Sequence, residues 1–126
     1  MKFTKNNIIK NEFWVFITAR SGSKTIKNKN IKLLNGVPLI AYSLIIARKL
    51  KFVKKIVFTS DSKKYHKIAK NYAQLENHLR SSRTSSDRAT DYDVFKEFIY
   101  YKLRKKDKLP EFFIHLRPTT PIRKVK

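Results

Sequence analysis

The residues best suited to chemistry in this sequence form a short basic cluster after an apolar stretch. The guanidinium of Arg20 can hydrogen-bond two phosphate oxygens at once, and Lys24 can supply a point charge. Gly22 lets backbone N–H groups approach an anion closely, and the hydroxyls of Ser21 and Ser23 can donate further hydrogen bonds. The cluster therefore predicts a phosphate-binding loop, made of Ala19, Arg20, Ser21, Gly22, Ser23 and Lys24.

Two familiar phosphate motifs do not fit this cluster. A P-loop needs Gly-Lys-Ser/Thr with a second glycine upstream, whereas Ser23 stands between Gly22 and Lys24. The chain has only two glycines, so it also lacks the G-x-G-x-x-G dinucleotide fingerprint. Taken alone, the cluster leaves a second interpretation open, an ordinary basic turn after a strand.

The elements before and after the cluster would place it at the edge of a sheet. Residues 12–19 (EFWVFITA) form a nearly continuous apolar run, which is typical of a strand buried in a parallel sheet. A loop is expected over 20–36, and Pro38 suits the first position of an apolar helix over 39–50. Residues 55–60 (KIVFTS) predict a second strand. Because ligands bind beyond the carboxyl ends of parallel strands, the basic cluster lies where a site is expected.

The second half of the chain continues the alternation of strand and helix. Asp61 or Ser62 can cap one helix, and Thr90 or Asp91 can cap another, with a polar irregular stretch over 74–90 between them. Residues 111–116 (EFFIHL) predict a third strand. The order predicts an α/β fold with a parallel sheet of three or four strands. Residues 1–12 are expected to be a flexible lead-in. The buried helical positions are expected to be Tyr65, Ile68, Ala69 and Tyr72, then Val94, Phe95, Phe98 and Ile99.

The composition favours one domain with a core and excludes several classes of protein. The chain has 126 residues, 41% of them hydrophobic, and no cysteine, which excludes a disulfide scaffold, a cysteine-ligated metal and a thiol nucleophile. No apolar run approaches the roughly 20 residues that span a bilayer. The apolar stretch 13–17 is too short for a signal peptide. We therefore expect a cytoplasmic protein that does not enter a membrane.

The net charge of +21 leaves a second function open. Such a charge suits a non-catalytic domain that binds RNA or another polyanion, because Lys and Arg neutralise phosphates. The lysines, however, are scattered along the chain as on a solvated surface. No RNP, homeodomain or zinc-finger signature supports a nucleic-acid partner.

Four motifs, in order, resemble the acylneuraminate (CMP-sialic acid) cytidylyltransferases. Residues 17–40 resemble the family's opening, I-P-A-R-x-G-S-K-x-I-P-x-K-N followed by G-x-P-L-I. Residues 59–61 (TSD) resemble its T-D/S-D strand end, and residues 80–87 (RSSRTSSD) its R-P-x-x-L-A-x-D segment. Residues 116–123 (LRPTTPIR) resemble its L-Q-P-T-S-P-L-R. The matches extend over residues 13–123, nearly the whole chain.

The resemblance implies a Rossmann-like nucleotidyltransferase fold of three layers, truncated after the strand that ends near Leu116. Residues 13–126 would be the N-terminal, nucleotide-binding part of the domain. The implied reaction joins CTP to a nonulosonic, sialic-type acid and releases pyrophosphate with the help of Mg²⁺. Full-length relatives are expected to be homodimers, and this chain alone could be an inactive fragment. No metal ligand is assigned, because the family's metal-binding aspartates would lie beyond this chain.

The resemblance also implies roles for individual residues. Arg20 and Lys24 would be the catalytic cations. Arg80 would lie against the cytosine. Arg117 stands where the family has a glutamine that faces the sugar, so it would bind the sugar acid, and Ser81 replaces the family's proline after the arginine. The remaining contacts to the triphosphate and nucleoside would come from Ser23, Lys29, Asn30, Thr90 and Asp91.

Overall fold

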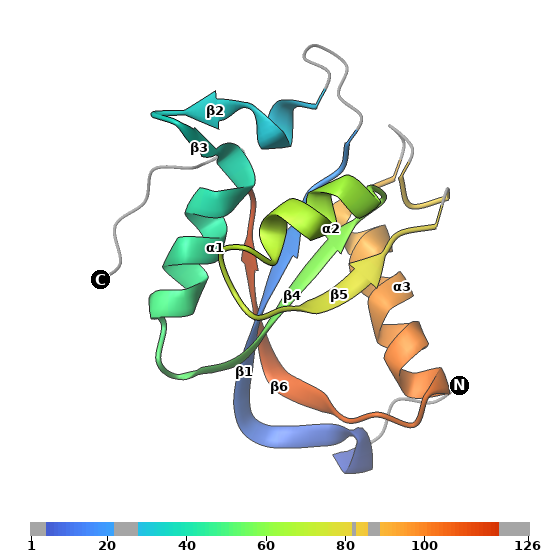
Figure 1. Ribbon diagram of the computed structural model, residues 1–126. Coiled ribbons are helices and arrows are strands. Elements are labelled where there is room, and N and C mark those ends of the chain that lie inside the picture. Colours follow the sequence, from blue (N-terminus) through green and yellow to red (C-terminus); the bar gives the residue numbers. More distant parts are fainter. Residues whose placement is uncertain (1–4, 22–27, 82, 86–88, 119–126) are drawn as a thin grey trace.

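A four-stranded parallel sheet forms the centre of the molecule (Figure 1). The computed structural model describes residues 5–21, 28–81, 83–85 and 89–118. The strands lie in the order β5-β4-β1-β6, and every neighbouring pair is parallel. They are β1 (Ile8–Thr18), β4 (Val53–Ser60), β5 (Glu76–Leu79) and β6 (Leu109–Leu116). The α/β class and the parallel sheet are therefore confirmed.

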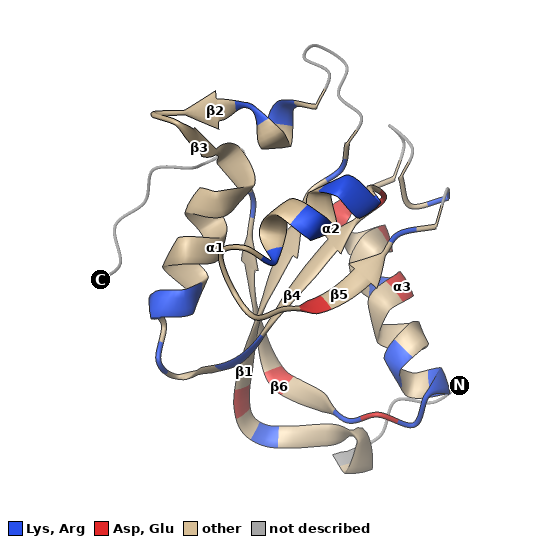
Figure 2. Cartoon of the chain, viewed as in Figure 1, with Lys and Arg blue, Asp and Glu red and all other residues tan. Residues whose placement is uncertain are grey.

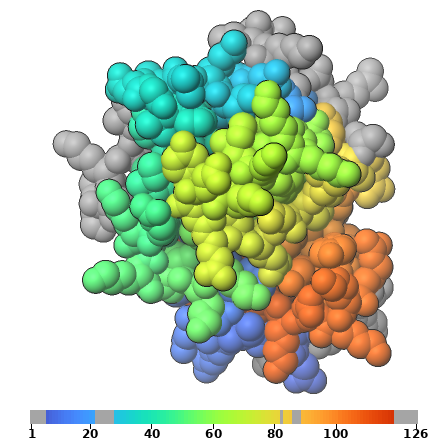
Figure 3. Space-filling view, viewed as in Figure 1, coloured from blue at the N-terminus to red at the C-terminus, as the bar shows by residue number. Residues whose placement is uncertain are grey.

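Helices cover both faces of the sheet. They are α1 (Leu39–Lys49), α2 (Lys63–Ala69) and α3 (Asp91–Arg104). Figure 3 shows α2 and the residues after it covering the middle of one face, with α1 to one side. Helix α3 packs on the opposite face. No helix in the described ranges has the length and apolar character needed to cross a bilayer.

The alternation of side chains along β1 explains the three layers. Val15 and Ile17 point to one face, where they join the cluster formed with α1 and α2. Trp14 and Phe16 point to the other face and pack against Val94 and Phe98 of α3. Because successive side chains of a strand face opposite ways, an unbroken apolar run requires cover on both sides. The four strand residues are each at most 1% exposed.

The predicted elements are present, but several boundaries differ. The first strand begins at Ile8, so a lead-in through residue 12 was too long, because Ile8 and Ile9 pair with Leu109 and Pro110 of β6. Pro38 is the residue before α1 rather than its first residue. The shorter predicted strands gain residues as β4 and β6. Pairing with distant strands, which no local pattern reports, sets these limits.

Several short elements were missed. The stretch 74–90, expected to be irregular, contains β5, which pairs along β4 from Val57 to Ser60. The expected loop 20–36 contains a short helix, η2 (Lys29–Ile31), and the first strand of a hairpin, β2 (Leu33–Leu34) with β3 (Val37–Pro38). Asn35 and Gly36 turn this hairpin at φ of 55° and 79°. Asn-Gly is the strongest short hairpin signal, so the sequence did carry it. The other short helix is η1 (Lys5–Asn7).

Candidate functional site

The strand order marks one edge of the sheet as the place for a ligand. From β1 the chain moves outward to β4 and β5, then returns through α3 to the other side of β1 as β6. The direction of winding therefore reverses between β1 and β6. Ligands of open α/β sheets bind outside the carboxyl ends of the strands at such a reversal. Of the predicted site residues, Arg20 follows β1, Arg80 follows β5 and Arg117 follows β6.

The predicted phosphate loop is anchored where it leaves β1. Ala19 is fully buried, and its N–H donates to the carbonyl of Thr59 at 2.9 Å, so β1 and β4 stay paired to this point. Ser21 then donates twice to Asp61, from its N–H at 2.8 Å and from its hydroxyl at 2.6 Å. Burial by itself raises the pKa of Asp61, but these hydrogen bonds and the nearby Arg80 charge outweigh it and hold the pKa below its usual range. Asp61 thus fixes the loop as a carboxylate.

The far side of the loop is tied back to its start. The side-chain amide of Asn30 donates to the carbonyl of Arg20 at 2.8 Å. Its other atom, Oδ1, is buried and has no hydrogen-bond partner within the described part of the chain. Nearby, Asn28 takes the left-handed conformation and accepts from the Tyr65 hydroxyl at 3.2 Å. Burial and the charge of Asp61 raise the pKa of Tyr65 to about 12, so this hydroxyl keeps its proton.

Arg80 brings a second half-buried cation to the same edge, beside Arg20. Its N–H donates to the carbonyl of Ser60 at 2.9 Å, and its Nη1 lies 3.5 Å from the carbonyl oxygen of Thr84. Burial lowers the pKa of Arg80, Asp61 and Asp91 favour its charged form, and Arg20 opposes it. Its Nε is buried without a hydrogen-bond partner in the ranges described. A buried N–H without a partner is costly, so a ligand that accepts from it would be favoured.

Asp91 and Arg117 form the third part of the site. Arg117 Nη2 lies 2.5 Å from Asp91 Oδ2, and His115 Nε2 lies 3.9 Å from the same oxygen. The same His115 nitrogen is 3.0 Å from the Thr18 hydroxyl, so β6, β1 and α3 meet here. Thr90 caps α3, and its hydroxyl accepts from the N–H of Asp93 in a reciprocal capping box. The expected cap is confirmed at Thr90, and Asp91 is the first helical residue.

The structure thus brings most of the predicted site together. Ala19, Arg20, Ser21 and Asn30 lie at the end of β1 and in the segment tied to it, and Lys29 begins η2. Arg80 is close enough to Asp61, Asp91 and Arg20 to interact electrostatically with all three. Gly22, Ser23 and Lys24, the middle of the predicted phosphate loop, lie outside the described residues.

The molecule carries a strong positive charge, and its few acidic side chains are engaged in local contacts. Figure 2 shows Lys and Arg on α2 and at the ends of α1 and α3, with acidic residues sparse. Each described acidic side chain already makes a hydrogen bond or an ion pair within the chain; they are Glu12, Asp61, Glu76, Asp91, Asp93, Glu97, Asp107 and Glu111. An anionic ligand therefore meets a favourable field as it approaches.

The described residues do not fit a magnesium site. They contain no group of three or more His, Asp or Glu side chains that could hold a metal ion. The two carboxylates nearest the site are engaged, Asp61 by Ser21 and Asp91 by Arg117. Mg²⁺ prefers carboxylate and phosphate oxygens in octahedral geometry.

Comparison with known proteins identifies the family. A sequence profile described as cytidylyltransferase matches residues 14–105, which include the end of β1 and all of α3. The chain belongs to the cytidylyltransferase family. The expectation drawn from the four motifs is thus confirmed.

Individual cytidylyltransferases show how much of the family's length this chain represents. An N-acylneuraminate cytidylyltransferase of Escherichia coli is 34% identical over 107 residues, 85% of this chain and 24% of the relative. A CMP-N,N'-diacetyllegionaminic acid synthase of Legionella pneumophila is 34% identical over 110 residues, 86% of this chain and 46% of the relative. The chain therefore spans between a quarter and a half of the length of these relatives.

A solved structure supports the fold independently of sequence. A CMP:2-keto-3-deoxy-manno-octonic acid synthetase, complexed with CTP, superposes with a TM-score of 0.68 at 16% identity. The match covers 85% of this chain and 40% of that one. The predicted Rossmann-like nucleotidyltransferase fold, present in part, is confirmed.

Sequence reasoning missed two residues that shape this cytidylyltransferase site. Asp61 or Ser62 was expected to cap a helix; Ser62 does cap α2, whereas Asp61 anchors Ser21, a role that was not predicted. Glu97 of α3 was not singled out, although it contacts Ser81 and Thr84 in the segment after β5. The position of Asp61 at a strand end was a usable signal. Glu97 carried none, because its contacts arise only when α3 packs beside that segment.

Proposed function

We propose that this chain is the nucleotide-binding part of an enzyme that joins CTP to a nonulosonic, sialic-type acid. The sugar hydroxyl oxygen attacks the α-phosphorus and forms a new P–O bond. The bond to the bridging oxygen breaks, pyrophosphate leaves, and the hydroxyl proton is released. Catalysis of such a transfer consists mostly of positioning and of stabilising charge. Two relatives named for CMP-sugar or N-acylneuraminate chemistry support this substrate class.

One observation carries the proposal most strongly. Arg80 is held at the carboxyl edge of the sheet with a buried, unpartnered Nε, beside the loop that Asp61 and Ser21 anchor. A half-buried cation with a buried, unused donor suits an acceptor on a nucleotide. We propose that Arg80 contacts cytosine and that Arg20, with Ser23, Lys24, Lys29 and Asn30, binds the triphosphate.

The other partners follow from the same assignment. Thr90 and Asp91 would lie near the nucleoside. Arg117, which already pairs with Asp91, would also pair with the carboxylate of the sugar acid. Mg²⁺ would arrive with the triphosphate and complete its shell with carboxylates outside the described residues. A homodimer of the full-length protein and a place in the cytoplasm remain predictions. Neither relative named above is named for binding RNA or another polyanion, so the RNA alternative gains no support from those names.

Calorimetric titration with nucleotides tests the proposal. The chain should bind CTP with Mg²⁺ more tightly than ATP or UTP, and Arg80→Ala should weaken CTP binding by about tenfold, the effect of losing one charge-assisted contact. Arg104→Ala is the matched control, since Arg104 is exposed at the opposite end of α3. A chain that binds all three nucleotides equally, with affinity falling steeply as salt rises, would favour the polyanion alternative.

A further inference from the structure

The backbone around Arg80 has little support of its own. Beyond the pairing of Leu79 with Ser60, one backbone hydrogen bond, from the Arg80 N–H to the Ser60 carbonyl, extends β5, and the Ser85 hydroxyl donates to the Ser81 carbonyl at 2.7 Å. Among the described residues, the guanidinium makes one hydrogen bond, to the carbonyl oxygen of Thr84 at 3.5 Å, so its direction depends on where Thr84 lies. Neither Ser81 nor Thr84 belongs to a helix or strand. Another part of the molecule must therefore hold these two residues.

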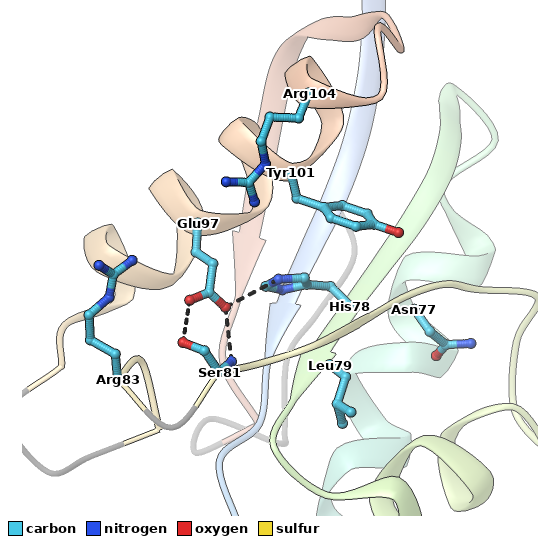
Figure 4. Close-up of a pocket in the computed structure, with 8 residues that line it drawn as sticks. All are labelled: Asn77, His78, Leu79, Ser81, Arg83, Glu97, Tyr101 and Arg104. Carbon is cyan, nitrogen blue, oxygen red and sulfur yellow. Dashed lines mark hydrogen bonds and ion pairs between the residues drawn. The ribbon is translucent and has the colours of Figure 1, made fainter. Parts of the chain in front are cut away.

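Glu97 of α3 holds them. Its Oε1 accepts from the Ser81 N–H at 3.1 Å and its Oε2 from the Ser81 hydroxyl at 2.5 Å. Oε1 also accepts from the Thr84 hydroxyl at 3.1 Å and lies 3.3 Å from Nε2 of His78. Figure 4 shows Glu97 pointing from α3 toward Ser81 and His78. Three residues that flank Arg80 in sequence thus meet on one carboxylate.

These contacts are protected from water and involve a charged group. The Glu97 side chain is 13% exposed and that of His78 6%. Burial by itself raises the pKa of Glu97, but the hydrogen bonds from Ser81 and Thr84, with His78, hold it below its usual range. Hydrogen bonds to a carboxylate are stronger than those between neutral groups. His78 passes the restraint to the sheet, because its Nδ1 lies 2.8 Å from the Thr59 hydroxyl of β4.

The cavity beside these residues shows that packing alone does not fix the segment. It has a volume of about 560 Å³ and is bordered by β5 on one side and α3 on the other. Its lining includes Ser81, Glu97 and His78. Since this side of Ser81 borders a cavity, hydrogen bonds restrain it there: those to Glu97 from another element, and that from the Ser85 hydroxyl within the same turn.

We propose that Glu97 is a positioning residue that holds Arg80 in the nucleotide site. It acts through Ser81 and Thr84 and touches no substrate itself. Ser81 offers two donors to one carboxylate, whereas the proline expected at this position from the family motif has no N–H to donate. In this chain, the hydrogen bonds of Ser81 and Thr84 to the Glu97 carboxylate, here called the clamp, thus take the place of the rigid proline ring. This inference rests on the proposed function, because the contact of Arg80 with the nucleotide is part of that proposal.

Hydrogen exchange tests the positioning without any ligand. In Glu97→Gln, the amides of Arg80 and Ser81 should exchange at least about tenfold faster, because local opening becomes easier. The amides of β4 should not change. Glu111→Gln is the matched control, with the same change of charge on the other edge strand, where Glu111 accepts from Asn11. Unchanged exchange at Arg80 and Ser81 would overturn the inference.

Nucleotide binding then tests whether the clamp acts through Arg80. Glu97→Gln should weaken CTP binding about fivefold or more, and leave binding of inorganic tripolyphosphate unchanged, since the base contact alone is disturbed. In an Arg80→Ala background the same change should have no further effect. Equal losses in both backgrounds, or an equal loss of tripolyphosphate binding, would show a merely structural role and overturn the inference.

A variant that does not fold, or a chain that binds no CTP, can also be interpreted. If Glu97→Gln fails to fold, Ser81→Ala removes one hydrogen bond of the clamp. It should give the same changes in amide exchange and in CTP binding, but smaller ones. If the unaltered chain binds no CTP, the proposed function and the nucleotide part of this inference both fail. Hydrogen exchange would still decide whether Glu97 holds Arg80, so the two failures are distinguishable.

Discussion

At the residue scale, the contact between Asp61 and Ser21 decides where the phosphate loop leaves the sheet. Both carboxylate oxygens accept from Ser21. Asp61→Asn keeps one acceptor but turns an NH₂ group toward the other donor. We expect a loss of about 1–2 kcal/mol in the free energy of unfolding at pH 7, because a hydrogen bond to a partly exposed carboxylate is replaced by a clash of donors. Urea denaturation measures it.

The pH dependence of the stability lost in Asp61→Asn provides the control for this prediction. The pKa of Asp61 is lower in the folded chain than the ordinary value of 3.8, so its contribution is fully present above 3.8. It disappears as the pH falls through the folded value. The stabilities of Asp61→Asn and the unaltered chain should therefore converge in acid. A gap that stays constant down to pH 2 would contradict the carboxylate's role.

His78 should make the fold sensitive to mild acid. Burial lowers its pKa from the ordinary value of 6.5, helped by the charges of Arg80 and His66 and opposed by Glu97. Since the folded pKa lies below the unfolded one, stability is complete above 6.5 and declines as the pH falls below it. The thermal midpoint of the unaltered chain should fall further between pH 7.5 and pH 5.5 than that of His78→Gln, by about 2 °C or more in scanning calorimetry. Equal slopes would disprove it.

At the element scale, the start of α3 depends on one side chain. Thr90 satisfies the N–H of Asp93, and Asp93 accepts from the N–H of Thr90 in return. Thr90→Ala should cost about 1 kcal/mol in the free energy of unfolding, whereas Thr90→Ser keeps the hydroxyl and should cost little. Urea midpoints of the two variants separate the cap from any other effect of the position. Equal losses would mean that the capping bond does not stabilise α3.

The elements that the sequence could predict share one property: their signal is local. The apolar run at 12–19 and the helical spacing of Val94 and Phe98 report burial directly, and β1 and α3 lie there. Strand β5 gave no such signal. Its residues are Glu76, Asn77, His78 and Leu79, and of these only His78 is buried. Only the edge of β4 makes this polar segment a strand.

At the scale of the whole molecule, the site shows the same division. The positions of Arg20 and Arg117 after strands followed from the alternating pattern and the family motifs, whereas Arg80 was named from its motif alone, because β5 was not predicted. The contacts around these arginines could not be predicted, because the carboxylates come from elements that are distant in sequence: Asp91 pairs with Arg117, and Asp61 and Glu97 accept from Ser21 and Ser81, the residues that follow the other two arginines. Strand order brings these carboxylates to one edge. The residue types of a site are thus readable in advance, whereas its hydrogen bonds require the assembled sheet.

The net charge should oppose folding and favour ligand binding at once. With 30 basic and 9 acidic residues, repulsion among cations acts on the compact state, and salt screens it. The ion pairs of Lys102 with Glu76 and Asp107 weaken with salt, but they are few beside the unmatched lysines. We therefore expect the thermal midpoint to rise by several degrees from about 20 mM to about 500 mM NaCl, while CTP affinity falls, since its attraction is screened too. NaCl and KCl at equal ionic strength should agree, which separates screening from specific ion binding. A midpoint that falls with salt would mean that the buried ion pairs outweigh the surface repulsion.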